Sequence, residues 1–210
     1  MARRTLLPLL ALILLGVLAS YALRNSRTLG EHVGTSPTVV RILQDHQSPQ
    51  EARGEGNLTV VMFTDYQCPS CRMADPALRA AIAHDGNVRL VYRDWPVFGE
   101  RSERAAKVAL AAHRQGVYAA LHHRLMTSAS LDDPALRIAV EEVGGNWEQL
   151  EADLLTDGPE IADQLARTSR DAFALGLAGT PGYLIGPLLV EGALTEREFL
   201  RAFDQARSGG

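Results

Sequence analysis

Cysteine and lysine are both scarce in this chain, and each scarcity narrows the possible chemistry. Cys68 and Cys71 are the only two cysteines among 210 residues, and two residues separate them. This leaves three interpretations of the pair: a structural crosslink, half of a metal site, or a reactive dithiol. Lys107 is the only lysine and lies in a helical stretch, which disfavours covalent catalysis through a lysine Schiff base.

Clustered positive charge is also lacking. The net charge is −4, and basic residues do not cluster outside the extreme N-terminus, so no electrostatic footprint for nucleic acid is present. The chain contains no internal repeat and no low-complexity tract. An apolar fraction of 46% and a charged fraction of 22% are ordinary for a globular protein. The length suits one domain, or one domain with an insertion.

The N-terminus differs from the rest of the chain. Arg3 and Arg4 precede an uncharged apolar run over residues 6–23, a pattern typical of an export signal. The run is also long enough to span a bilayer as an uncleaved anchor. We therefore interpret residues 1–24 as a signal peptide or N-terminal membrane anchor that places the body in the periplasm or otherwise outside the cytoplasm. Disulfide chemistry is permitted there. A cytoplasmic protein with an apolar N-terminal helix is the alternative.

The segment after the signal is predicted to lead into a βαβ unit. Residues 25–57 are polar and charged, with one short apolar stretch at 39–43 that could pack on the domain, and we interpret them as a linker and lead-in to the domain. The continuous apolar run over 58–63 predicts a strand buried on both faces. Beyond the cysteines, Met73, Leu78, Ala81 and Ile82 have the spacing of one helix face, and residues 87–95 read as a second strand. Residues 58–100 thus predict a parallel βαβ unit.

A helical block and a β-β-α ending complete the chain. Residues 101–170 predict a helical insertion, with separate helices around Trp147 and around Ile161. In residues 171–207, two short strands flank Gly186-Pro187 as in a hairpin, and Thr195 with Glu198 forms a capping box that opens the last helix. The predicted fold class is α/β, a thioredoxin-like order with an inserted helical domain.

The motif Cys68-Pro69-Ser70-Cys71 stands between the first predicted strand and its helix. Pro69 fits the first helical position, so Cys68 should lie at the helix N-terminus. The unpaired N–H groups and partial positive charge there favour thiolate over thiol, which makes Cys68 the attacking sulfur. Cys71 lies one turn further on the same face, more shielded, and can resolve a mixed disulfide by intramolecular attack. The motif therefore predicts a redox pair.

The other two interpretations of the cysteines are weaker. A crosslink of this spacing closes almost no loop and would stabilise little. A metal site needs more ligands than two thiolates, and the histidines are scattered without ligand spacing: His32, His46, His84, His113, His122 and His123. We interpret the adjacent His122 and His123 as polar positions on an inserted helix. No metal and no bound cofactor is predicted.

Three features together resemble the DsbA-like family of exported thiol–disulfide oxidoreductases. They are FTDYQCPSCRMADPAL from residue 63, the long helical insertion, and AGTPGYLIG at residues 178–186. The resemblance covers roughly residues 58–206. It implies that Cys68 is the exposed nucleophile and Cys71 its buried partner. It also implies that Thr180-Pro181 forms a cis-proline loop that faces the disulfide and hydrogen-bonds substrate backbone, where an ordinary trans turn is the alternative.

The motif departs from the best-known DsbA proteins at Ser70, where they carry a histidine that helps stabilise the thiolate. Serine brings no positive charge, so the oxidising strength is open. Asp65, three residues before the motif, could assist proton transfer to or from Cys71, although such an aspartate is more often a turn or capping residue. Tyr66 and Trp95-Pro96 either line a peptide groove or pack in the core.

The predicted function is that of an exported enzyme that donates disulfides to folding secreted or periplasmic proteins. Its expected partners are cysteine-containing protein substrates and, by resemblance, a membrane redox partner that reoxidises the pair. One alternative is a reductase or isomerase that is kept reduced. Another is a module that binds Cu(I) through the two thiolates, for which Met73 is the one close candidate neighbour.

Overall fold

The computed structural model describes Gly16 and residues 29–209. Apart from Gly16, the predicted signal or anchor over residues 1–24 lies outside the described residues. Within the described part of the chain, no helix combines the length and apolar character needed to cross a membrane.

A six-stranded sheet forms the centre of the described chain, with the strand order β1-β6-β5-β3-β4-β2. The strands are β1 (Glu31–His32), β2 (Gln50–Ala52), β3 (Leu58–Thr64), β4 (Val88–Asp94), β5 (Gly182–Ile185) and β6 (Leu188–Glu191). β3 and β4 pair in parallel, and the other neighbouring strands pair antiparallel. The predicted parallel βαβ unit and the predicted hairpin are both confirmed.

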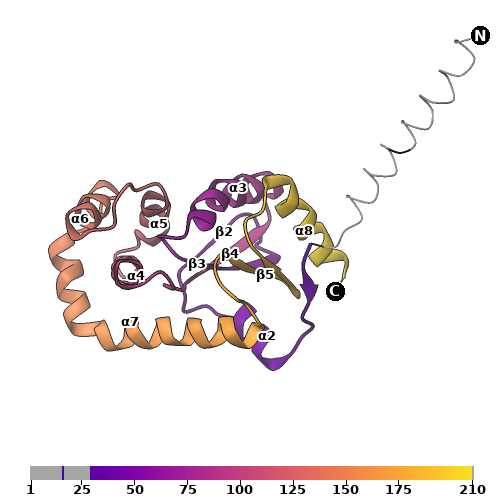
Figure 1. Cartoon of the computed structure of the whole chain (residues 1–210), viewed down its shortest axis with the longest axis horizontal. Coiled ribbons are helices and arrows are strands. Elements are labelled where there is room, and N and C mark those ends of the chain that lie inside the picture. Colours follow the sequence, from indigo (N-terminus) through magenta and orange to yellow (C-terminus); the bar gives the residue numbers. More distant parts are fainter. Residues whose placement is uncertain (1–15, 17–28, 210) are drawn as a thin grey trace, which may run out of the picture.

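Helices cover both faces of this sheet and extend to one side of it. They are α2 (Pro37–Leu43), α3 (Pro69–Asp85), α4 (Glu100–His113), α5 (Tyr118–Met126), α6 (Asp133–Glu142), α7 (Trp147–Leu175) and α8 (Glu196–Ser208). In Figure 1, α3 and α8 lie above the sheet, α2 and the end of α7 lie below it, and α4 to α6 form the block on the left. This arrangement is the thioredoxin-like order with a helical insertion that the sequence predicts.

Strand β3 is buried on both faces, as its continuous apolar sequence predicts. Val60 and Met62 belong to the core that contains residues of α3 and α8, whereas Val61 and Phe63 belong to the core that contains residues of α2 and α7. Both cores anchor the strand that ends next to the cysteine motif, so the start of α3 is held from two sides.

The helical block differs from the prediction at one point. Two separate helices are expected around Trp147 and Ile161, but α7 is one helix of 29 residues that continues through Pro159. Leu150, Ile161 and Leu165 are buried along it, while Pro159 is exposed. Solvent can satisfy the carbonyl that a proline leaves unpaired, and tertiary packing on both sides of Pro159 holds one continuous helix.

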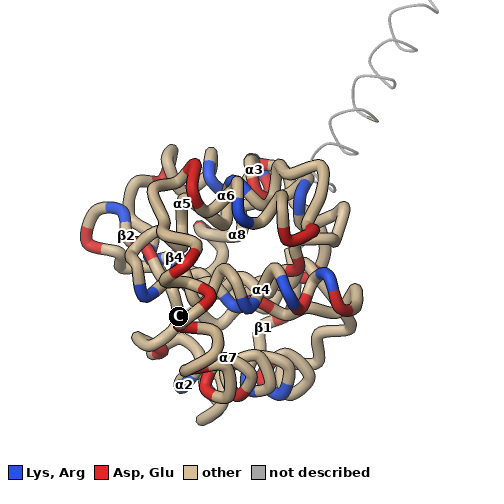
Figure 2. Tube along the Cα trace, turned by 90° about the vertical axis from the view of Figure 1, so that its left-hand side faces the viewer, with Lys and Arg blue, Asp and Glu red and all other residues tan. Residues whose placement is uncertain are grey.

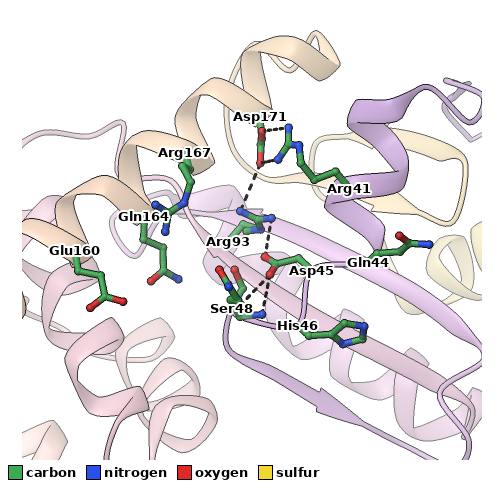
Figure 3. Close-up of a pocket in the computed structure, with 11 residues that line it drawn as sticks. Arg41, Gln44, Asp45, His46, Ser48, Arg93, Glu160, Gln164, Arg167 and Asp171 are labelled. Atoms are coloured by element: carbon green, nitrogen blue, oxygen red, sulfur yellow. Dashed lines mark hydrogen bonds and ion pairs between the residues drawn. The ribbon is translucent and has the colours of Figure 1, made fainter.

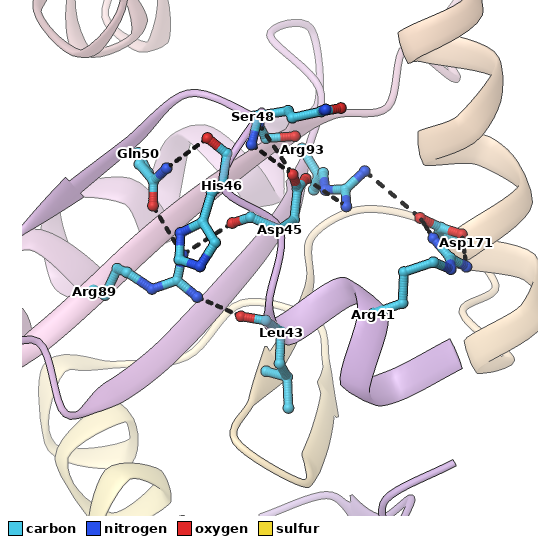
Figure 4. A network of polar contacts seen from close by, with 10 residues as sticks. Arg41, Leu43, Asp45, His46, Ser48, Gln50, Arg89, Arg93 and Asp171 are labelled. Carbon is cyan, nitrogen blue, oxygen red and sulfur yellow. Dashed lines mark hydrogen bonds and ion pairs between the residues drawn. The ribbon is translucent and has the colours of Figure 1, made fainter. Parts of the chain in front are cut away.

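Residues 25–57 are predicted as a linker and lead-in, and the described part of this segment contains two strands and a helix that belong to the fold. β1 and β2 form the two edges of the sheet, and the expected packing of residues 39–43 is confirmed by buried Val39 and Ile42 in α2. Figure 4 shows how Arg89 of β4 donates hydrogen bonds to Leu43 at the end of α2, to Asp45 and to Gln50 at the start of β2. Strands of two or three residues are too short to leave a periodic sequence pattern, so the sequence alone did not reveal them.

Helix α3 places one predicted core residue in solvent. Met73 is 67% exposed, and Asp75 occupies the buried position two residues later with only 3% exposure. The predicted capping box at Thr195 and Glu198 is confirmed. Figure 2 shows positions of both charge signs interspersed along α4 and neighbouring helices.

Candidate active site

Cys68 is the N-cap residue of α3, and Pro69 is the first residue of that helix. The backbone N–H of Cys71 donates a hydrogen bond to the Cys68 sulfur, with the two heavy atoms 3.4 Å apart. Both cysteines are free thiols. The first cysteine therefore occupies the helix N-terminus, where unpaired N–H groups and the helix dipole favour an anion. The preference of this sulfur for the thiolate form stays a prediction.

The loop before β5 faces the first cysteine. The Thr180–Pro181 peptide bond is cis. The Cys68 thiol donates to the Thr180 carbonyl oxygen over 3.3 Å, although the two residues are 112 positions apart in the chain. Ala178 is exposed, Thr180 is half-buried and Pro181 is buried. The loop thus presents backbone at the surface directly beside the sulfur.

The expected exposure of Cys68 is wrong. Cys68 is only 2% exposed and Cys71 is 3% exposed, so the exposed fraction does not distinguish the two cysteines. The carbonyl of Thr180 lies against the Cys68 sulfur and accounts for part of the cover. Pro69 is exposed and Ser70 half-buried, so the dipeptide between the cysteines reaches the surface although the sulfurs do not.

The electrostatic environment of Cys71 favours its thiol form. Burial raises the pKa of Cys71 to about 12, and a hydrogen bond from the Asp65 backbone opposes this only in part. Cys71 is therefore protonated at neutral pH when the pair is reduced. A proton must reach this sulfur whenever its disulfide bond is broken.

Asp65 anchors the loop beside the cysteines. One carboxylate oxygen accepts from the Val97 and Phe98 backbone N–H groups over 2.7 and 3.0 Å. The other accepts from the Gln67 backbone and the Ser102 hydroxyl over 2.7 and 2.6 Å. These are the contacts of a turn and capping residue, the second interpretation that the sequence allows. The described hydrogen bonds of the Asp65 carboxylate reach neither sulfur, so the relay role of Asp65 stays a prediction.

The sequence did not single out Arg72 or Gln67, which hold the cysteine turn in place. The Arg72 guanidinium donates to the carbonyls of Tyr66, Leu125 and Ser128, linking the start of α3 to the end of α5. The Gln67 amide donates to the Phe98 carbonyl over 3.1 Å. Apart from the nearby Tyr66 carbonyl, the partners of Arg72 and Gln67 are far away in sequence. No local sequence pattern could therefore have marked Arg72 or Gln67.

A buried chain of polar side chains starts beside the motif. Tyr118 donates to the Asp94 carboxylate over 2.9 Å, Tyr66 donates to the Tyr118 oxygen over 3.4 Å, and His122 Nδ1 lies 3.2 Å from the Tyr66 oxygen. Burial raises the pKa of Asp94 to about 7, because its hydrogen bond from Tyr118 only partly offsets the loss of water. Asp94 is therefore a buried carboxyl group whose pKa lies close to neutral pH.

Tyr66 packs in the core, whereas Trp95 and Pro96 line a pocket of about 270 Å³ together with Val97 and Phe173. Tyr66 and Trp95 are 1% and 3% exposed, and the Trp95 ring packs edge-on against Phe63 and Phe173. Apolar side chains that reach solvent here include Val97, 45% exposed, and Phe98, 52% exposed, on the next loop. These are the two residues whose backbone Asp65 holds.

A polar cleft of about 790 Å³ opens between the segment after α2, strand β4 and helix α7, and neither cysteine lines it (Figure 3). Buried Arg93 lies 2.7 Å from Asp45 and 3.6 Å from Asp171, and Arg41 pairs with Asp171 at 2.7 Å. The charges compensate one another, so this cluster joins α2 and α7 to the sheet. It supplies no chemistry to the cysteines.

Comparison with known proteins gives a consistent set of similarities. A family model described as a DSBA-like thioredoxin domain matches residues 59–204. A thioredoxin-like oxidoreductase from Silicibacter pomeroyi DSS-3 is 36% identical, with a TM-score of 0.77 over 84% of this chain and 100% of that one. A periplasmic thioredoxin-like protein from Salmonella enterica serovar Typhimurium is 26% identical, with a TM-score of 0.73 over 83% of this chain and 99% of that one.

Curated sequence relatives are much longer proteins. The Na(+)/H(+) antiporter NhaA 3 of Salinispora tropica is 30% identical over 173 residues, which is 78% of this chain and 25% of the antiporter. The chain therefore spans about a quarter of the length of the curated relatives it matches.

Proposed function

The chain belongs to the family of DSBA-like thioredoxin domains, and we propose that it is an exported thiol–disulfide oxidoreductase that donates disulfides to other proteins. The observation that carries this proposal is the asymmetry of the cysteine pair. The sulfur of Cys68 accepts an N–H at the tip of α3, whereas burial raises the pKa of Cys71 to about 12. Such a pair offers one attacking sulfur and one resolving sulfur.

The proposed reaction starts from the oxidised pair. A substrate thiolate attacks the Cys68 sulfur, and the bond between Cys68 and Cys71 breaks as the mixed disulfide forms. Cys71 leaves as a thiolate and takes up a proton, since its pKa of about 12 lies far above neutral pH. A second substrate thiolate then attacks the substrate sulfur and releases Cys68. Two electrons pass from the substrate thiols to the enzyme.

A substrate can reach the buried Cys68 sulfur only if it displaces the group that covers this sulfur. The Thr180 carbonyl contacts this sulfur, and an extended substrate chain can hydrogen-bond the loop backbone while its own sulfur takes that place. Exposed Val97 and Phe98 are positioned by Asp65 to contact apolar side chains of the same substrate. Unfolded proteins, which expose both backbone and apolar residues, fit these two features.

The proposed location is the periplasm or another extracytoplasmic compartment. The signal-like pattern over residues 1–24 supports export, whether the segment is cleaved or retained as an anchor. The similarity to a periplasmic Salmonella protein supports it independently. A membrane redox partner would reoxidise the pair after each turnover.

Equilibration of the protein with glutathione buffers of defined ratio, followed by thiol counting, tests the direction of transfer. A potential well above the glutathione couple supports disulfide donation. A potential well below it would replace the proposal with the reductase alternative.

A trapping experiment tests the assignment of the two sulfurs. Cys71→Ser should accumulate mixed disulfides with periplasmic proteins, because the resolving sulfur is gone. The matched Cys68→Ser variant should accumulate none. Mixed disulfides on Cys68→Ser would reverse the assigned roles, and their absence from both variants would remove the proposed reaction.

Met73, the one candidate neighbour for Cu(I) binding by the two thiolates, does not face the core as Cys71 does. Helix α3 turns Met73 into solvent with 67% exposure, whereas Cys71 points into the core. The thioether of Met73 is therefore on the opposite side of the helix from the second thiol.

A further inference from the structure

Three side chains with metal-binding chemistry meet one helical turn behind the redox pair. Asp75 lies four residues after Cys71 on the buried face of α3, and His122 and His123 reach it from α5. Asp75 is 3% exposed, His122 is fully buried, and the His123 side chain is 25% exposed. The two histidines are thus not simply polar positions on an inserted helix, because both are directed at one buried carboxylate.

The distances suit shared coordination better than hydrogen bonding. His122 Nε2 and His123 Nδ1 each lie 3.4 Å from the same oxygen, Asp75 Oδ1, and neither nitrogen has a hydrogen-bond partner. A ring N–H that donates to an oxygen typically lies about 2.7–3.2 Å from it. Around a tetrahedral ion with bond lengths of about 2.0–2.1 Å, neighbouring ligand atoms lie roughly 3.3–3.4 Å apart. All three ligand atoms fall within 4.8 Å of one another.

One tautomer of His122 leaves lone pairs facing the shared space. His122 Nδ1 lies 3.2 Å from the Tyr66 oxygen, and in the tautomer that carries its proton on Nδ1 the ring donates to that oxygen. In that tautomer the proton-free Nε2 of His122 lies 3.4 Å from the carboxylate oxygen Asp75 Oδ1. Two acceptors facing each other in the core repel unless a cation lies between them.

The outer partners are those that metal ligands commonly have. A ligating histidine usually has a hydrogen-bond partner for its second ring nitrogen, and the Tyr66 oxygen lies 3.2 Å from His122 Nδ1. A ligating carboxylate is usually held by a further donor, and Arg79 Nε donates to the other oxygen of Asp75 over 3.1 Å. Oδ1 is left for the ion.

We propose that Asp75, His122 and His123 bind one divalent transition-metal ion of the zinc class. Two imidazole nitrogens and one carboxylate oxygen form a three-ligand set, and water completes the tetrahedron from the partly exposed side of His123. The ion would join α5 of the helical block to the helix that carries the cysteines. The site uses neither sulfur and is therefore separate from the redox pair.

Zinc titration of the oxidised protein by calorimetry tests this proposal, because the disulfide removes both thiolates as competing ligands. Wild type should bind one Zn²⁺, and Co²⁺ in its place should give the visible absorption of a tetrahedral nitrogen–oxygen site. His123→Gln should weaken binding by at least about tenfold, as should Asp75→Asn. His84→Gln is the matched control, an exposed histidine of α3 that should leave the affinity unchanged.

Thermal unfolding gives a second readout that does not depend on enzyme activity. Excess Zn²⁺ should raise the melting temperature of oxidised wild type and of His84→Gln, but not that of His123→Gln, since an ion that binds only the folded state stabilises it. Circular dichroism without metal establishes that the variants fold. Absence of zinc binding by oxidised wild type, or equal affinity in wild type and a folded His123→Gln, would overturn the assignment.

Discussion

Replacing Asp94 by asparagine should change how the stability of this protein depends on pH. Asp94 lies at the end of β4, its residue is 3% exposed, and Tyr118 donates to its carboxylate over 2.9 Å. Burial raises its pKa from 3.8 to about 7. Asparagine has nearly the same shape and retains an acceptor for the tyrosine, but it cannot ionise.

The size of the effect follows from proton linkage. Between pH 4 and 7 the folded protein keeps the Asp94 proton, whereas the unfolded chain releases it. The stability contributed by the protonated group is thus complete below about pH 4 and is lost as the pH rises towards 7. At about 1.4 kcal/mol per pKa unit, the loss is about 4 kcal/mol. This is a large part of the 5–15 kcal/mol typical of a folded domain.

Urea unfolding of the oxidised protein at several pH values from 4 to 8 measures this difference. The free energy of unfolding should fall with pH more steeply in wild type than in Asp94→Asn, and their difference should change by about 4 kcal/mol over the range. Asp163→Asn, at an exposed position of α7, is the control and should follow wild type. Parallel curves for wild type and Asp94→Asn would show that Asp94 is already ionised at pH 4 in the folded protein, and the reasoning would fail.

Other substitutions test the fold and the loop beside the cysteines. Asp65→Ala removes the acceptor of four hydrogen bonds and should destabilise the protein by at least about 3 kcal/mol in urea unfolding; a loss below 1 kcal/mol would contradict its anchoring role. Leu150→Ala should cost about 2–5 kcal/mol because the side chain is fully buried, whereas Leu155→Ala on the same helix, 87% exposed, should stay within about 0.5 kcal/mol; similar losses would refute the assigned face of α7. Thr195→Ala should cost about 1 kcal/mol through loss of the capping box, and an unchanged melting temperature would show the cap to be dispensable.

The two proposals place different chemistry on one helix. Helix α3 presents Cys68 and Cys71 at its start and Asp75 one turn later. Tyr66, which precedes the helix, contacts His122. A metal ion at Asp75 would therefore restrain the segment that positions the cysteines. Because the disulfide and the proposed ion use separate ligands, glutathione equilibration and zinc titration can each fail without affecting the other.

The sequence by itself determined the features that rest on local patterns. An uninterrupted apolar run specified β3, Pro69 placed Cys68 at the helix N-cap, and Thr195 with Glu198 specified the start of α8. Each depends on residues within a few positions of one another, where backbone geometry and hydrogen bonding are fixed by residue type. The order of these elements was enough to identify the fold.

Tertiary structure decided what depends on residues far apart in the chain. The Thr180 carbonyl covers the Cys68 sulfur from 112 positions away, so no property of the motif could reveal that the expected nucleophile is buried. Asp75 meets His122 and His123 only because α5 packs on α3, and the spacing of the histidines alone gave no ligand pattern. Burial and long-range contacts arise from how helices and strands pack, and single-sequence periodicity records which face of an element is apolar but not which element covers it.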